Sequence, residues 1–355
     1  MRRSLEVCSG FLVFLIGMEL LLRLLPTSTA SLTGYYIDPD ILTYPSGHRW
    51  TASTGWDMRN AQRLSANNLG FVSDIDFIAD RQAVVLVGDS YIEASMLPAA
   101  SRPGAQLQRQ LVDRPVYAMG SPGTALLDYA ERIRYAATRL QAQNFIVLME
   151  PGDVEQSLCG SGNVHSICLD PVSLTRQRQR LADASAAKKW LRHSALAQYL
   201  VSQLKVEPAK LWATAFRRDT PHGSESEQGT TAHTLPAAPA TAADLAAERR
   251  TADRVADEFL RVVHEHARGR VMIVVDGQRP PTVQRGTSTL AASDWFVRRA
   301  REAGLTVVEL DGVYVTHRSV SEMSLSVSPS DGHLNALGVA LATRAMSDEF
   351  NRSKR

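Results

Sequence analysis

The chain of 355 residues is long enough for one large α/β domain or two smaller ones, and either would bury a substantial core. Apolar residues make up 44% of the chain, which excludes a wholly disordered protein. The 39 Lys and Arg residues nearly balance the 37 Asp and Glu residues, for a formal net charge of +2. A nucleic-acid partner is therefore not expected, because it would need clustered basic residues.

The N-terminal segment has the pattern of an export signal. Two arginines follow Met1, and an apolar run, Cys8–Leu25, comes after them. The charged residues Glu19 and Arg23 interrupt this run. They are four residues apart and would pair on a helix. The run is near the lower limit for spanning a bilayer, and the arginines would remain cytoplasmic. We predict a signal anchor over residues 1–30, in the inner membrane, with the rest of the chain periplasmic. The alternative is a signal peptide cleaved after Ser28-Thr29-Ala30.

An alternation of strands and helices follows a leader over residues 31–80. The leader is rich in Gly, Pro, Ser and Asn and is expected to be irregular and to pack onto the domain. Short apolar runs typical of strands buried on both faces are Ala83–Val87, Pro115–Met119, Phe145–Met149, Val271–Val275 and Leu305–Leu310. Helical patterns between them cover Pro103–Leu111, Leu126–Gln141, Ala247–Ala267 and Asp294–Ala303. This order predicts a parallel sheet with helices on both faces, in a domain over residues 81–350.

Two segments interrupt the alternation. Residues 172–216 carry a helical pattern that includes Trp190 and Tyr199, and they are expected to form an inserted lid or flank. We expect these aromatic side chains to pack between helices rather than to bind sugar. Residues 217–246 have few large apolar side chains and are expected to form a mobile loop.

Cys159 and Cys168 lie in a segment rich in Gly, Ser and Asn. In an oxidising compartment they could close a small disulfide loop, and the alternative is two free thiols. His165 is the only further ligand type in this segment, and the spacing fits no common zinc pattern. We therefore predict no metal site and no cofactor.

The segment Gly88-Asp89-Ser90 directly follows the predicted strand Ala83–Val87. In an open α/β sheet, ligands bind beyond the carboxyl ends of the strands. A serine at such a strand end, where a helix begins, exposes its hydroxyl beside backbone N–H groups that can stabilise an oxyanion. Ser90 is thus a candidate nucleophile, and the alternative is an ordinary turn with a helix-capping side chain.

A second polar block, Asp331-Gly332-His333, opens the final helical stretch, which runs through Phe350. A serine hydroxyl needs a base to take its proton, and that base needs an orienting partner. Asp331 and His333 are close enough to share one short loop, so that Asp331 could hold the imidazole that faces the serine. The alternative is a capping aspartate beside a surface histidine.

Together, these two blocks resemble those of the SGNH/GDSL hydrolase superfamily, and the resemblance covers roughly residues 65–350. It implies a flavodoxin-like three-layer sandwich with Ser90 as nucleophile, His333 as base and Asp331 as the orienting acid. The segments Asn67–Phe71 and Tyr91–Ala94 resemble a membrane-anchored bacterial envelope branch, related to proteins that O-acetylate alginate and other exopolysaccharides.

The middle blocks of the superfamily are matched less closely. The resemblance implies an oxyanion hole built from the amides of Ser90 and Gly120, with Gly123 as a second candidate. Gly152 stands where the superfamily has an oxyanion-binding asparagine, and the last block has Asp-x-His where many members have Asp-x-x-His. The residues expected to line the site are Asp89, Gly123, Gly152 and Asp153.

The resemblance implies an O-acetyl esterase that acts on envelope or extracellular polysaccharide, so the expected partner is an acylated carbohydrate. With a sugar hydroxyl as acceptor, the same residues would make an O-acetyltransferase, supplied with acyl groups by a membrane acyltransferase. A third alternative is a non-catalytic, carbohydrate-binding envelope scaffold that keeps the fold.

Overall fold

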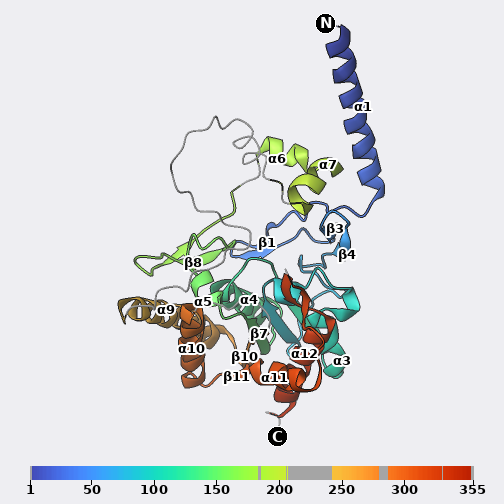
Figure 1. Cartoon of the computed structure of the whole chain (residues 1–355). Helices are drawn as coiled ribbons and strands as arrows, with labels where there is room; N and C mark the ends of the chain where they lie inside the picture. Colours follow the sequence, from blue (N-terminus) through green and yellow to red (C-terminus); the bar gives the residue numbers. More distant parts are fainter. Residues whose placement is uncertain are drawn as a thin grey trace.

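A five-stranded parallel sheet forms the centre of the computed structural model (Figure 1). The structure describes residues 2–182, 185–204, 206, 242–279, 287–329 and 331–352. The strands of the sheet are β5 (Val84–Gly88), β6 (Val116–Gly120), β7 (Asn144–Met149), β10 (Val271–Val275) and β11 (Thr306–Glu309). Their order is β11-β10-β7-β5-β6, and all neighbours are parallel. This is the doubly wound, flavodoxin-like order, whose switch point lies between β5 and β7.

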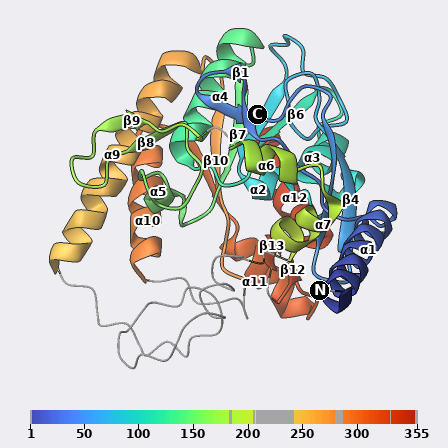
Figure 2. The same cartoon turned by 90° about the horizontal axis from the view of Figure 1, so that it is seen from above.

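Helices cover both faces of the sheet, which confirms the predicted three-layer sandwich (Figure 2). One face packs against α4 (Leu126–Arg139), α9 (Ala242–His266) and α10 (Thr287–Glu302). The other packs against α3 (Pro103–Gln110), α11 (Asp311–Val320) and α12 (Ala336–Arg352). Because successive side chains of a strand point to opposite faces, Val85 and Val87 enter one core, and Val84 and Leu86 enter the other.

The predicted core strands match the observed ones to within one residue at most boundaries. The helices differ more at their starts, because α9 begins at Ala242 and α10 at Thr287, both earlier than predicted. These first turns carry mainly small or polar residues, which do not contribute to an apolar period. Of the predicted mobile loop, residues 217–241 lie outside the described residues, and the rest belongs to α9.

The leader is not irregular, contrary to the prediction, because it contains two antiparallel hairpins. They are formed by β1 (Gly34–Asp38) with β2 (Ile41–Thr43), and by β3 (Arg49–Thr54) with β4 (Arg59–Ser65). Phe77 of the leader is buried and stacks on Tyr117 of β6, with ring centroids 4.6 Å apart. β1 and β2 are short, and in β4 only Ala61 and Leu64 are apolar, so these strands lack the apolar run or alternation that would reveal them in the sequence.

Further short elements follow β7 and include the disulfide that the sequence suggested. After α5 (Asp153–Gln156), Cys159 is bridged to Cys168, which lies on β8 (Ile167–Leu169), and β8 pairs with β9 (Arg176–Arg178). The inserted segment forms α6 (Ala186–Leu191), α7 (Ala195–Ala197) and the π-helical turn η2 (Gln198–Gln203), and residues 207–216 lie outside the described residues. Trp190 is 73% exposed, so the expectation that it packs between helices is wrong.

The N-terminal helix α1 (Arg2–Leu24) projects away from the domain (Figure 1). Its segment Glu6–Leu24 is long and apolar enough to cross a membrane, a property it shares with signal sequences. Glu19 and Arg23 pair as predicted, with Arg23 Nε 2.8 Å from Glu19 Oε1.

Candidate active site

Ser90 is the first residue of the short helix α2 (Ser90–Glu93), at the carboxyl end of β5. Asp89 caps this helix, since its Oδ1 accepts a hydrogen bond from the Tyr91 N–H at 2.9 Å. A side chain at Gly88 would have its Cβ 2.5 Å from Cγ1 of Ile92, so only glycine lets the helix fold back so tightly. The turn therefore presents the Ser90 hydroxyl at the edge of the sheet, where parallel α/β folds bind ligands.

The structure brings the three predicted catalytic residues together. His333 lies on the hairpin of β12 (Ser326–Ser328) and β13 (Asp331–Leu334), and not at the start of the final helix, as the sequence suggested. Its Nε2 is 2.9 Å from Ser90 Oγ, and its Nδ1 is 2.5 Å from Asp331 Oδ1. The side chains of His333 and Asp331 are 29% and 30% exposed. Ser90, His333 and Asp331 are thus hydrogen-bonded in the order in which acyl transfer needs a nucleophile, a base and an orienting acid, and the His333 and Asp331 side chains are partly open to solvent.

The surroundings of His333 favour its protonated form. Burial lowers the pKa of His333, but the hydrogen bond and charge of Asp331 outweigh it, so that the pKa is raised above its ordinary value. The charges of Asp89 and Glu150 act in the same direction. A base with a raised pKa binds the proton of the serine hydroxyl more firmly, which stabilises the imidazolium formed when Ser90 attacks.

The two candidate oxyanion glycines have different surroundings. A Cβ at Gly120 would lie 2.3 Å from the backbone N of Glu93, so this glycine is needed for the close approach of α2 to β6. Ser121 N–H donates to Gly88 O in the ladder with β5, so by alternation the Gly120 N–H points away from β5, on the edge strand. Gly123, with φ of 71°, lies in the turn after β6, where a Cβ would contact only Val164, at 3.8 Å. These contacts favour Gly123 over Gly120 as an accessible donor.

Three carboxyl groups lie near the nucleophile. Burial raises the pKa of Asp89, and it raises that of Asp153 well above the usual range, where the charges of Asp89 and Glu150 add to the effect. Asp153 is fully buried, and its Oδ2 accepts a hydrogen bond from Glu150 N–H at 3.0 Å, so it shapes the turn after β7 instead of lining the site. Gly152, just before α5, is partly exposed. Among the residues that the structure describes, no group of three His, Cys, Asp or Glu side chains is arranged to hold a metal ion.

No protein-family model and no curated protein matches the chain. Among solved structures, a lipolytic protein of the G-D-S-L family from Veillonella parvula is similar, with 10% identity and a TM-score of 0.39, over 76% of this chain and 98% of that chain. A lipase/acylhydrolase from Enterococcus faecalis has 12% identity and a TM-score of 0.39, over 77% and 96% of the two chains. An acetyl xylan esterase has 12% identity and a TM-score of 0.36, over 75% and 98%.

A buried arginine, not recognised in the sequence, supports the loop that carries His333. Arg279 Nη2 donates to the Gly332 carbonyl at 2.7 Å, and the hydroxyl of Tyr91 donates to the same carbonyl at 3.1 Å. The rings of Tyr91 and His333 are in contact, with centroids 4.7 Å apart. Because Tyr91 directly follows the nucleophile, these contacts join the two halves of the catalytic pair.

The Arg279 guanidinium is positioned by the buried Asp276, which in turn accepts a hydrogen bond from Tyr314. Its Nη1 lies 2.6 Å from Asp276 Oδ2, and Asp276 Oδ1 also accepts a hydrogen bond from the Tyr314 hydroxyl, at 2.9 Å. Asp276 directly follows β10, and Tyr314 is on α11, so the sheet and a flanking helix both position the guanidinium. Asp276 is only three residues from Arg279, but the Gly332 carbonyl that Arg279 binds is distant in the chain, so nothing near Arg279 in the sequence indicates this role.

A second buried arginine ties together the strand ends beneath the site. Arg132 of α4 donates to the carbonyls of Gly88 and Met119, at 2.6 and 3.3 Å, and to Thr124 Oγ1 at 2.7 Å. It is 1% exposed, and burial lowers its pKa. Arg132 therefore fixes the ends of β5 and β6 and the turn that contains Gly123.

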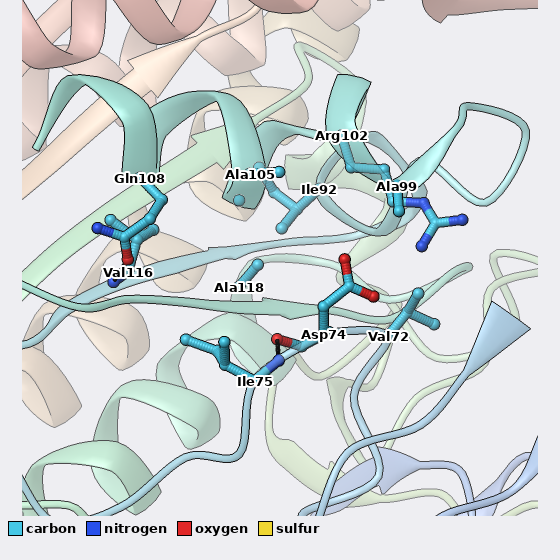
Figure 3. Close-up of a pocket in the computed structure, with 12 residues that line it drawn as sticks. Val72, Asp74, Ile75, Ile92, Ala99, Arg102, Ala105, Gln108, Val116 and Ala118 are labelled. Atoms are coloured by element: carbon cyan, nitrogen blue, oxygen red, sulfur yellow. Dashed lines mark hydrogen bonds between the residues drawn. The ribbon is translucent and has the colours of Figure 1, made fainter. Parts of the chain in front are cut away.

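A cavity of about 220 Å³ lies behind α2, between α3, the edge strand β6 and residues 72–75 of the leader (Figure 3). Ile92, two residues after the nucleophile, forms part of its wall, and Arg102 and Asp74 are polar groups at its rim. Among the described residues that line it, neither Ser90 nor His333 is present. The cavity is therefore separate from the catalytic pair, which lies on the exposed carboxyl edge of the sheet.

Proposed function

We propose that this protein is an SGNH-type serine hydrolase that cleaves acyl esters. The observation that carries the proposal is the hydrogen-bonded series Ser90 Oγ, His333 Nε2, His333 Nδ1 and Asp331 Oδ1. A non-catalytic scaffold would have no need for this series, or for the buried arginine that supports it.

The geometry supports a two-step acyl transfer. Ser90 Oγ bonds to the acyl carbonyl carbon while His333 takes the hydroxyl proton, and His333 then gives that proton to the departing alcohol oxygen. Water attacks the acyl-enzyme by the same route and releases the acid and free Ser90. The Ser90 N–H, at the start of a helix and without an intrahelical partner, and the Gly123 N–H are the proposed donors to the oxyanion.

The proposed substrate is an O-acetyl ester of an envelope or extracellular polysaccharide. Its support is the resemblance of Asn67–Phe71 and Tyr91–Ala94 to the membrane-anchored envelope branch, together with α1 as a candidate anchor. The partial exposure of the catalytic pair suits an ester on a large polymer. We further propose that α1 spans the inner membrane and that the domain is periplasmic, where a membrane acyltransferase could supply acyl groups if the acceptor is a sugar hydroxyl.

The test is hydrolysis of an aryl acetate by the intact protein, with and without an oligosaccharide acceptor. Ser90→Ala and His333→Ala should each lower kcat by about 10⁴–10⁶-fold. The double variant should have nearly the same kcat as either single variant, because neither residue contributes much to catalysis without the other. Ser319→Ala and His264→Ala, at exposed positions on α11 and α9, are the matched controls and should keep full activity. A folded Ser90→Ala protein with the wild-type rate would refute the proposal. An acetylated oligosaccharide product would identify a transferase.

A further inference from the structure

The inserted helices lie beside the domain end of α1 (Figure 1), and together with the β3–β4 turn they expose an apolar surface. We call it the juxtamembrane surface. It is formed by the inserted helices and by the β3–β4 turn, and its members are Trp56 (77% exposed), Trp190 (73%), Leu191 (42%), Leu200 (39%) and Val201 (49%). Single exposed apolar residues need no explanation, but two tryptophans with aliphatic neighbours on adjoining elements indicate a binding surface.

The juxtamembrane surface is fastened to α1 through a carboxylate within the apolar helix. Glu19 accepts hydrogen bonds from Ser194 Oγ at 2.8 Å, and from the backbone N–H groups of Ala195 and Leu196 at 3.0 and 2.9 Å. Arg23, which pairs with Glu19, also donates to the His193 carbonyl at 3.1 Å. The two polar interruptions of the apolar run thus hold the inserted helices in place.

The same helices are fastened to the leader on their other side. Gln203 accepts a hydrogen bond from Ser28 N–H at 3.0 Å and donates to the Gly55 carbonyl at 2.7 Å. The Tyr199 hydroxyl donates to the Trp56 carbonyl at 2.9 Å. The β3–β4 turn, the inserted helices and the end of α1 therefore form one connected unit.

The length of α1 sets the depth of this unit. The apolar segment Glu6–Leu24 has 19 residues, or about 28 Å of helix. This is close to the hydrocarbon thickness of about 30 Å, so the whole segment is needed to cross it. Glu19 lies about 8 Å from the end of this segment, at about 1.5 Å per residue. The residues that contact Glu19 then lie about 8 Å inside the hydrocarbon boundary, within the depth of about 5–10 Å to which interfacial helices bury their apolar face. Tryptophan is enriched at this depth, and the cationic Lys189 and Arg192 beside Trp190 suit anionic headgroups.

We propose that the juxtamembrane surface is embedded in the headgroup layer of the membrane that α1 spans, on the side of the domain. The aromatic and aliphatic side chains bury against acyl chains, and Glu19 binds the helix that carries them. The domain is thereby held at a fixed height and orientation instead of swinging on a tether. This inference rests on the proposed membrane anchoring by α1.

The test measures depth with a fluorescent label on one cysteine of the full-length protein. The protein is reconstituted in vesicles of phosphatidylethanolamine and phosphatidylglycerol whose acyl chains carry a quencher near the headgroup. Trp190→Cys is made with Cys8→Ser, because Cys8 is the free cysteine among the described residues and the other two are bridged. Val320→Cys, also with Cys8→Ser, is the control: this residue is 82% exposed and ends α11, at the end of the domain opposite α1 (Figure 1).

The label at position 190 should lose most of its fluorescence to the quencher, and the label at 320 should lose almost none. Replacing two exposed side chains should leave the fold intact. Labelling Cys8 in the unaltered chain reports on α1 separately. Quenching at Cys8 without quenching at 190 would overturn the proposal while the anchor stands, and would assign the surface to a protein partner. No quenching at either position would overturn the anchor and the proposal together.

Discussion

The protonation state of His333 links the geometry of the site to a measurable pH dependence. His333 must be neutral to act as base, and Asp331 raises its pKa, so kcat/KM should rise with pH through a midpoint above the ordinary value for histidine. In Asp331→Asn the imidazolium loses its partner, so this midpoint should move to lower pH. The plateau should fall by about 10²–10⁴-fold, because the ring also loses its orientation. A pH–rate profile on an aryl acetate measures both effects, and an unmoved midpoint would contradict the role of Asp331.

Arg279 should position the catalytic loop without touching the substrate. Arg279→Lys keeps a charge beside Asp276 but cannot hold both Asp276 and the Gly332 carbonyl in the same geometry, so kcat should fall by about 10–10²-fold with little change in KM. Arg318→Lys, an exposed arginine on α11, should have no effect. A rise in KM alone would instead indicate that Arg279 binds substrate.

Arg279→Met separates this role from that of a structural ion pair. It removes the guanidinium that pairs with the buried Asp276 carboxylate, so the free energy of unfolding should fall by about 3–5 kcal/mol. Thermal unfolding of the two Arg279 variants distinguishes lost positioning from lost stability.

The sequence predicted Ser90, Asp331 and His333 because their chemistry appears in short blocks at the ends of elements. Arg132 and Arg279 were missed for a physical reason: they act on backbone carbonyls, which carry no sequence signal, and those carbonyls are distant in the chain. Gly120 was predicted as an oxyanion donor, and the structure shows that glycine is also needed there for packing, since a Cβ would lie 2.3 Å from the backbone N of Glu93.

At the scale of elements, one hydrogen bond joins the leader to the helix of the nucleophile. The Tyr44 hydroxyl donates to Glu93 Oε2 at 2.7 Å, and burial raises the pKa of Glu93 from 4.5 to about 7. Between these values the folded protein holds a proton that the unfolded chain has lost, so this stability is full below pH 4.5 and is lost as the pH rises to about 7. This contribution comes from the burial of Glu93, whereas the hydrogen bond from Tyr44 itself favours the ionised carboxylate.

Glu93→Gln removes this pH dependence while keeping an acceptor for Tyr44. The variant should match the wild type near pH 4.5 and should be more stable by about 3 kcal/mol at pH 8, where the wild type must hold a buried charge. Denaturant unfolding at the two pH values measures the difference. Glu302→Gln, whose side chain is 61% exposed, is the control and should change neither value. Equal stability of Glu93→Gln and wild type at pH 8 would contradict the raised pKa of Glu93.

The elements that were predicted well are those whose side chains are buried on both faces. The run Val271–Val275 matches β10 at both ends, because a central strand of a parallel sheet is apolar throughout. The β1–β2, β3–β4 and β12–β13 hairpins were missed because β2, β12 and β13 have only three or four residues each, and because β1, β3 and β4 are mostly half-buried or exposed. His333 was consequently expected at a helix start and lies on β13.

The whole molecule combines an apolar N-terminal helix, a disulfide and an exposed apolar surface whose elements are distant in the chain. The positive and apolar N-terminus and the cysteine pair could be recognised locally in the sequence. The exposure of Trp190 could not, because it follows from hydrogen bonds between the inserted helices and Glu19, at the far end of the chain. Sequence periodicity alone assigns such a residue to a core.

The disulfide provides a reporter of where the domain resides in the cell. If α1 directs export, Cys159 and Cys168 should be bridged in protein taken from cells whose thiols are alkylated at lysis, because the bridge persists only in an oxidising compartment. A chain without residues 2–25 should remain in the reducing cytoplasm, with both thiols alkylated. Mass analysis of the peptides that contain the two cysteines measures the bridged fraction in each case. Alkylation of both cysteines in the full-length protein would place the domain in the cytoplasm and would remove the support for an envelope substrate, while the aryl-ester activity of Ser90 would be unaffected.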